Sequence, residues 1–286
     1  MLDFSASLLD QVTIPANIDF PVKFEKTKVP SKKYVINGNT GEYLETVGST
    51  FKCASHGEFF RNVLTTVENN LDASALVDVK AKWRTALNGG FAMLDLQLPK
   101  MNVAIEQEKI QSTIGNRIIA LHGIDGSCSN QTYFGAIDFF CTNGMILGDH
   151  SKVKRKNTSA FSLDAFIAEL RQCRNDFYDN AARFQTWANT SLKGLDVGAL
   201  LEKLCNSKKQ AEKMFALFQD ETEKRGFNKF ALYSAFTNYA SYADERNGFE
   251  LRKTENDTAA LSMWRRENDV NKWVSNPLFI EAGVAA

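Results

Sequence analysis

The sequence lacks the features that define several classes of protein. Its cysteines are odd in number and contain no CxxC pair, which argues against a disulfide framework and against a zinc cluster. They are Cys53, Cys128, Cys141, Cys173 and Cys205. No apolar run reaches the length of a membrane span, and the N-terminus has no basic segment followed by a long apolar one. We therefore expect a cytoplasmic protein that does not enter a membrane.

Net charge and catalytic motifs are also missing. Lys plus Arg and Asp plus Glu number 34 each, so attraction of a polyanion must come from a local surface. The three histidines, His56, His122 and His150, form no HExxH or HxH spacing, which disfavours a metal site. The glycine-containing loop Gly123–Ser127 lacks the lysine of a phosphate-binding loop and precedes a strand. We predict no cofactor, no metal and no catalytic site.

The composition that is present is globular, and its first half carries strand signals. Val77–Arg84 alternates apolar and polar residues, and Phe91–Leu98 follows after a turn with two glycines, which predicts a hairpin. A second hairpin is predicted around the turn Asn37–Gly41. Apolar residues of Phe59–Val67 recur at steps of three and four and indicate a helix. Further strands are predicted at Gly115–His122 and Tyr133–Phe140, on either side of the glycine-containing loop.

The second half changes to a helical pattern. Ser162 is a candidate N-cap for a long helix that continues to Trp187, and further helices are expected at about 197–206, 208–225, 229–245 and 258–274. The sequence thus predicts an α+β protein: a β-hairpin-rich sheet with a packed helix, followed by a helical region. We divide it into an extended, proline-containing N-terminal arm (1–31), a β-rich core (32–158), a helical region (159–275) and a flexible tail (276–286).

The densest charge in the chain is the run Lys152–Lys156, which has four cations in five residues. Such a run can neutralise phosphates and release counterions without reading sequence, although a solvated loop is an equally good interpretation. The surrounding residues 151–213 contain 12 Lys and Arg against 7 Asp and Glu. The candidate nucleic-acid contacts are Lys152, Lys154, Arg155 and Lys156, with Arg117, Arg171 and Arg174 as secondary contacts and Tyr133 as a stacking candidate.

Several stretches, in order along the chain, resemble a phage and plasmid family, the domain of unknown function numbered nine-three-two. They are Tyr34–Gly48, Phe51-Lys52, Gly89-Gly90, Ile118–Ser127, Phe139–Gly144 and Tyr233–Tyr239. The resemblance implies a mobile element, most simply a bacteriophage, as the source, and the cytoplasm of a bacterial host as the location. The order of a hairpin sheet followed by helices is also similar to phage single-strand annealing proteins. Those proteins oligomerise and hold single strands along a basic groove without ATP.

Three functions follow as hypotheses. The first is a non-enzymatic, homo-oligomeric protein that binds and anneals single-stranded DNA without sequence specificity, in phage recombination or replication. The second is a phage protein that binds a host protein through an exposed surface. The third is an enzyme that acts on nucleic acid with a metal ion held by Asp125 and Asp138.

Overall fold

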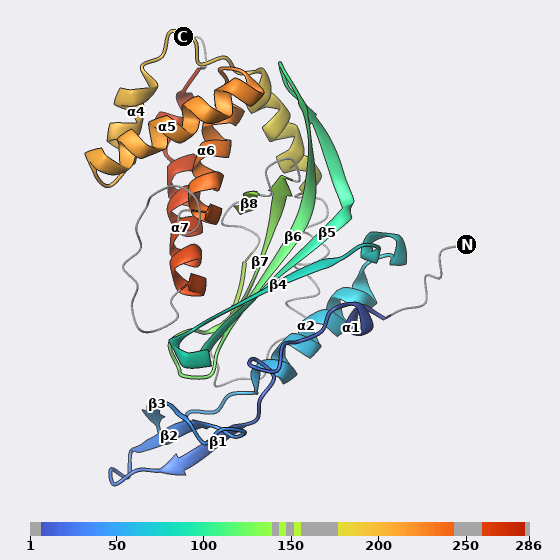
Figure 1. The fold of residues 1–286 in the computed structure, drawn as a ribbon, viewed down its shortest axis with the longest axis vertical. Coiled ribbons are helices and arrows are strands. Elements are labelled where there is room, and N and C mark those ends of the chain that lie inside the picture. Colours follow the sequence, from blue (N-terminus) through green and yellow to red (C-terminus); the bar gives the residue numbers. More distant parts are fainter. Residues whose placement is uncertain (1–6, 139–142, 147–151, 156–176, 243–258, 284–286) are drawn as a thin grey trace.

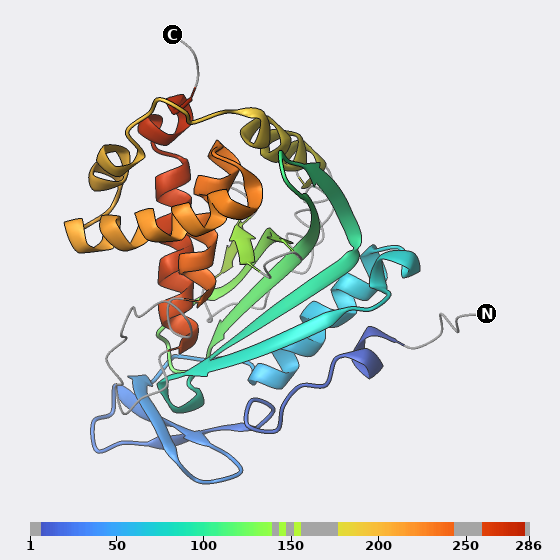
Figure 2. The same cartoon turned by 45° about the horizontal axis from the view of Figure 1, so that its top comes forward.

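A computed structural model of the chain describes residues 7–138, 143–146, 152–155, 177–242 and 259–283. These residues form a large twisted antiparallel sheet with helices on both sides, and a small separate sheet at one end (Figures 1 and 2). The predicted α+β class is therefore confirmed. Among the described residues, no helix has both the length and the apolar character needed to cross a membrane.

The large sheet has the strand order β4-β5-β6-β7, and two short strands pair with the outer side of β7. Its strands are β4 (Lys80–Ala86), β5 (Phe91–Glu106), β6 (Gln111–Gly123), β7 (Asn130–Asp138), β8 (Asn143–Ile146) and β9 (Lys152–Arg155). The turn between β4 and β5 has Gly89 at φ 85°, a backbone conformation that favours glycine. The hairpin predicted from Val77–Arg84 and Phe91–Leu98 is confirmed, although β5 continues to Glu106. The strands predicted at Gly115–His122 and Tyr133–Phe140 overlap β6 and β7.

Helix α2 (His56–Asn70) covers one face of this sheet, together with α1 (Leu8–Gln11) and the short 3-10 turn η1 (Ala73–Leu76). Its start is fixed by Ser55, whose side chain accepts a hydrogen bond from the Glu58 N–H at 3.1 Å. The apolar stripe of α2 packs on alternate residues of β5 and β6. Burying each such side chain contributes about 1.5–3 kcal/mol, so this layer defines which face of β5 points inward.

The C-terminal helices lie on the other side of the sheet (Figure 1). They are the helical residues 177–189, α4 (Val197–Leu204), α5 (Lys208–Arg225), α6 (Lys229–Tyr242), α7 (Ala259–Val274) and α8 (Pro277–Glu281). Buried Arg225 joins them to the sheet, because it donates to Asp138 of β7 at 2.6 Å, to Ser112 of β6 at 2.7 Å and to Glu221 of its own helix at 2.7 Å. Met263 of α7 packs on Phe91, Met93 and other residues of the sheet face opposite α2.

The small sheet, called here the N-terminal sheet, consists of β1 (Val22–Lys26), β2 (Lys32–Asn37) and β3 (Tyr43–Gly48). It lies at the end of the large sheet near the β4–β5 turn (Figures 1 and 2). Val35 and Val47 are buried, while β1 is largely exposed. The predicted β2–β3 hairpin is confirmed, but the region expected to be an extended arm contains α1 and also β1, which pairs with β2.

The C-terminal segment differs from the prediction of a flexible tail. Residues 277–281 form α8, and its Phe279 is fully buried against Trp187 and Phe236, with ring centroids 5.2 and 5.7 Å away. Lys229 also donates a hydrogen bond to the Ile280 carbonyl at 2.7 Å. Asn276 caps the short helix through the Leu278 N–H, and a proline follows as its first residue, which is a favoured start. Burial of the Phe279 side chain thus packs the segment that was predicted to be flexible against the helical region.

Candidate nucleic-acid interface

Residues Lys152–Arg155 of the predicted basic run form strand β9 at the border of the large sheet. Lys152 lies opposite Tyr133 of β7, Lys154 opposite Gln131, and Arg155 opposite Asn130. These residues are therefore a strand and not the loop considered as the alternative, because the outer side of β7 offers backbone hydrogen bonds to them. Three other predicted contacts, Lys156, Arg171 and Arg174, lie outside the described residues.

Arg117 is not available to a phosphate, which corrects its prediction as a secondary contact. Its side chain is fully buried. It donates to both carboxylate oxygens of Asp95, at 2.8 and 3.0 Å, and to Glu267 of α7 at 2.9 Å. Burial raises the pKa of Glu267, and the charge of Arg117 lowers it. Arg117 thus holds α7 on the sheet.

Tyr133 is likewise placed in the core, so the prediction of base stacking is wrong for this residue. It is 5% exposed, and its ring lies 4.1 Å, centroid to centroid, from Trp264 of α7. Its hydroxyl donates to Gln131 of the same strand. The apolar neighbours of Tyr133 in β5, β6 and α7 make this a packing position.

A second basic surface, which sequence reasoning missed, lies on the N-terminal sheet. Residues 21–52 contain six lysines and three glutamates, and no Asp or Arg. The lysines are Lys23, Lys26, Lys28, Lys32, Lys33 and Lys52, and all but the partly exposed Lys33 are exposed. They escaped notice because they are spread over three strands and two turns. The sequence sign of this basic surface is that residues 21–52 lack aspartate, and not that their lysines form a dense run.

The two basic segments meet the same loop of the large sheet. The β6–β7 loop contains Gly126, where an added methyl carbon would stand 3.7 Å from side-chain carbons of both Phe51 and Val47. This loop therefore packs on the N-terminal sheet. It ends at Asn130, the first residue of β7, which pairs with Arg155 of β9. The lysines of the N-terminal sheet and the cations of β9 accordingly lie at the same end of the molecule.

The two aspartates considered as metal ligands stand at opposite ends of β7. Asp125 lies in the loop before the strand and accepts hydrogen bonds from the Ser127 N–H at 2.9 Å and the Ser127 hydroxyl at 2.5 Å. Asp138 ends the strand and is paired with Arg225. Among the described residues, no group of three or more His, Cys, Asp and Glu side chains is placed to hold a metal ion. A site built on these two aspartates is therefore contradicted by their separation.

The fold also brings together two histidines that are 66 residues apart. The Nδ1 atoms of buried His56 and His122 lie 2.8 Å apart, and His56 Nε2 lies 2.8 Å from the Gly89 carbonyl oxygen. A carbonyl only accepts, so His56 Nε2 carries the proton and His56 Nδ1 accepts from His122 Nδ1–H. His122 Nε2 is then unprotonated, and it has no hydrogen-bond partner among the described residues. Burial lowers both pKa values, that of His56 to about 4.

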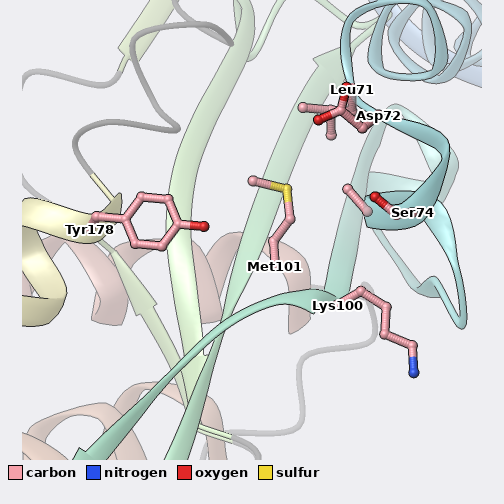
Figure 3. A pocket seen from close by; sticks show the side chains of 7 residues that line it. Leu71, Asp72, Ser74, Lys100, Met101 and Tyr178 are labelled. Atoms are coloured by element: carbon pink, nitrogen blue, oxygen red, sulfur yellow. The ribbon is translucent and has the colours of Figure 1, made fainter.

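A pocket of about 200 Å³ lies between η1, the bend of β5 and Tyr178 (Figure 3). The side chain of Lys100 points away from the other labelled lining residues and forms an ion pair of 3.0 Å with Asp78. The volume is below the roughly 300–1,000 Å³ of typical small-molecule sites. The lining residues that the structure describes contain a single carboxylate, that of Asp72, and no His or Cys, so we assign the pocket no catalytic role.

These observations define an α+β protein with a basic border to its large sheet and a basic N-terminal sheet beside it. The model of the family described as Domain of unknown function (DUF932) matches residues 44–277. The chain therefore belongs to this family. The match begins within β3, so β1 and β2 precede it. Neither the curated proteins nor the solved structures contain a match.

Proposed function

We propose that the protein binds and anneals single-stranded DNA without sequence specificity, in phage recombination or replication. The observation that carries the proposal is the position of the cations of β9 at the same end of the molecule as the lysines of the N-terminal sheet. A phosphate backbone several nucleotides long could then meet both, and each neutralised phosphate releases counterions. The chain has no net charge, so these two groups of cations are a local excess of positive charge that a phosphate backbone could contact.

The test is salt-dependent binding of a labelled oligothymidylate by the double variant K152A/K154A. If both lysines contact phosphates, affinity at low salt falls about tenfold or more. The slope of log affinity against log salt becomes shallower by about 1.4, which is about 0.7 for each lost contact on a single strand. Fluorescence anisotropy over a series of salt concentrations measures both quantities.

A matched control removes the same charge from the opposite border of the sheet. Lys80 and Lys82 are exposed on β4, so K80A/K82A changes net charge equally. This control should leave affinity and slope within about twofold of the parent protein. Equal losses in both variants would show a general charge effect and would reject β9 as the site. Absence of any binding by the parent protein would reject the function itself.

A second function, binding of a host protein, has one observation in its favour. Leu195, Leu278 and Ile280 are 38%, 40% and 55% exposed, and the first two line a pocket of about 360 Å³ between α4 and α8. Apolar side chains grouped on a surface mark protein contacts. Measuring the mass in solution with and without an oligonucleotide separates the alternatives. Assembly that depends on the oligonucleotide supports DNA binding, whereas assembly lost in L278S/I280S supports a protein interface.

A further inference from the structure

The solvent-facing side of the N-terminal sheet carries two tyrosines in contact. Strand register places Tyr34 of β2 and Tyr43 of β3 on this side, and their ring centroids are 5.7 Å apart with an interplanar angle of 83°. Tyr34 is 38% exposed and Tyr43 is 49% exposed, whereas Val35 on the opposite side is fully buried. A cross-strand pair adds some stability to the hairpin. That role alone does not require both rings to face solvent in a basic surrounding.

The charge around the tyrosines is complementary to a phosphate backbone. Lys23 and Lys32 alternate onto the same side of the sheet, while Lys33 lies on the other side with its Nζ 4.0 Å from the centre of the Phe24 ring. The six lysines and three glutamates of residues 21–52 leave an excess of three positive charges on this small unit. Two carboxylates reduce the positive charge near the tyrosines: Glu25 lies directly opposite Tyr34, and Glu45 accepts a hydrogen bond from the Tyr43 hydroxyl.

We propose that Tyr34 and Tyr43 form a stacking platform for the unpaired bases of single-stranded nucleic acid, with the lysines of the N-terminal sheet on its phosphates. This inference rests on the proposed function. Lysines attract single strands and duplexes alike, because both carry phosphates. A base in a duplex is covered on both faces by its neighbours, whereas an unpaired base has a face free to stack on a tyrosine ring. The platform therefore supplies the preference for single strands that charge alone does not.

The geometry also limits what the platform holds. The rings meet edge to face at 83° and do not share a plane, so they cannot hold one base together and each ring stacks a separate base. Tyr43 hydroxyl contacts Glu45 at 3.3 Å and Thr46 at 3.0 Å, which orients the ring without covering its face. The platform serves two adjacent bases and reads no sequence, since every base has a face that stacks.

The experiment compares the full chain with Y34V/Y43V and with Y34F/Y43F, using an oligothymidylate and a duplex of equal length. Valine keeps the preference for a strand and removes the rings, whereas phenylalanine keeps the rings and removes the hydroxyls. The valine variant should bind the single strand at least tenfold more weakly and the duplex within twofold of the parent protein. Its salt dependence should be unchanged because the phosphate contacts remain. The phenylalanine variant should retain the single-strand preference.

Several results would overturn the platform. Unchanged single-strand affinity in the valine variant, with normal binding by the parent protein, rejects the platform and leaves the proposed function standing. Equal losses for the single strand and the duplex show an electrostatic or structural effect and also reject it. So does a dimer of the free protein, seen by sedimentation, that dissociates in the valine variant while DNA binding is unchanged. A parent protein that does not bind the single strand rejects both proposals.

A measurement on the unaltered protein covers the case in which the valine variant does not fold. An oligonucleotide containing 5-iodouracil crosslinks on irradiation to aromatic rings stacked on the modified base. Mass spectrometry of the digested complex should locate the crosslink at Tyr34 or Tyr43. Crosslinks confined to aromatic residues elsewhere in the chain would reject the platform whatever the variants do.

Discussion

The buried pair of His56 and His122 should make the protein lose stability between pH 7 and pH 5. Both imidazoles are neutral in the folded protein, because His56 Nε2 donates to the Gly89 carbonyl and its Nδ1 accepts from His122. An added proton on His122 Nε2 finds no acceptor among the described residues. In the unfolded chain both side chains take up protons near pH 6.5. Acid therefore favours the unfolded chain.

The magnitude follows from the displaced pKa values. The pKa of His56 falls from 6.5 to about 4, so between pH 7 and pH 5 this residue alone removes about 2 kcal/mol from the free energy of unfolding. The pKa of His122 is lowered as well, by burial and by the neighbouring His56, so its protonation in the unfolded chain adds to this loss. The stabilisation is present above pH 6.5 and is lost as pH falls toward 4. Carboxylates with ordinary pKa values titrate mostly below this window.

Urea unfolding at half-unit steps from pH 7.5 to pH 5 measures this loss. The variant H122F keeps an aromatic ring against Phe59, whose ring lies 4.5 Å from that of His122, and should reduce the loss whatever its stability at pH 7. The chain has only three histidines, so imidazole NMR can also assign their protons. A proton on Nε2 of His56 and on Nδ1 of His122 is expected. Titration of either residue near pH 6.5 in the folded protein would refute the reasoning.

Two further predictions concern the core. Replacing Arg117 by Met should lower the free energy of unfolding in urea by about 3–5 kcal/mol, because Asp95 and Glu267 are left buried without their cation. The control is the exposed ion pair of Arg61 and Asp19, where R61A should lower it by about 1 kcal/mol or less. Replacing Phe279 by Ala should cost about 3–5 kcal/mol, whereas the exposed neighbour in I280A should cost about 0.5 kcal/mol or less. An R117M protein of unchanged stability, or equal effects of F279A and I280A, would contradict these assignments.

Much of the fold could be predicted from local patterns. Alternation and glycine-containing turns indicated the hairpins β2–β3 and β4–β5, and apolar steps of three and four indicated α2. The strands β6 and β7 and the helices α4–α7 were also predicted close to their observed positions. The strand β1 was missed because Pro21 and Pro30, on either side of it, resemble the punctuation of an extended arm. β1 forms by pairing with the edge of β2, and the sequence of β1 itself does not indicate that partner.

The site was harder to predict because it depends on partners distant in sequence. Arg117 lies within a run of apolar residues, which was a local sign of burial, but its acids are 22 and 150 residues away. Without knowledge of those partners, a charged residue such as Arg117 is predicted to lie on the surface. The reverse error hid the N-terminal sheet, where lysines separated along the chain come together only after three strands pair.

The buried ion pairs of Arg117 have a consequence for synthesis of the chain on the ribosome. Arg117 is made 150 residues before Glu267, which corresponds to roughly 8–30 s at 5–20 residues per second. During that interval the guanidinium has Asp95 but lacks its second acid. The part of the sheet that α7 covers, around Phe91 and Met93, therefore stays uncovered until α7 has been made. Conditions that slow translation of the C-terminal region should lower the yield of folded protein more than those that slow its beginning.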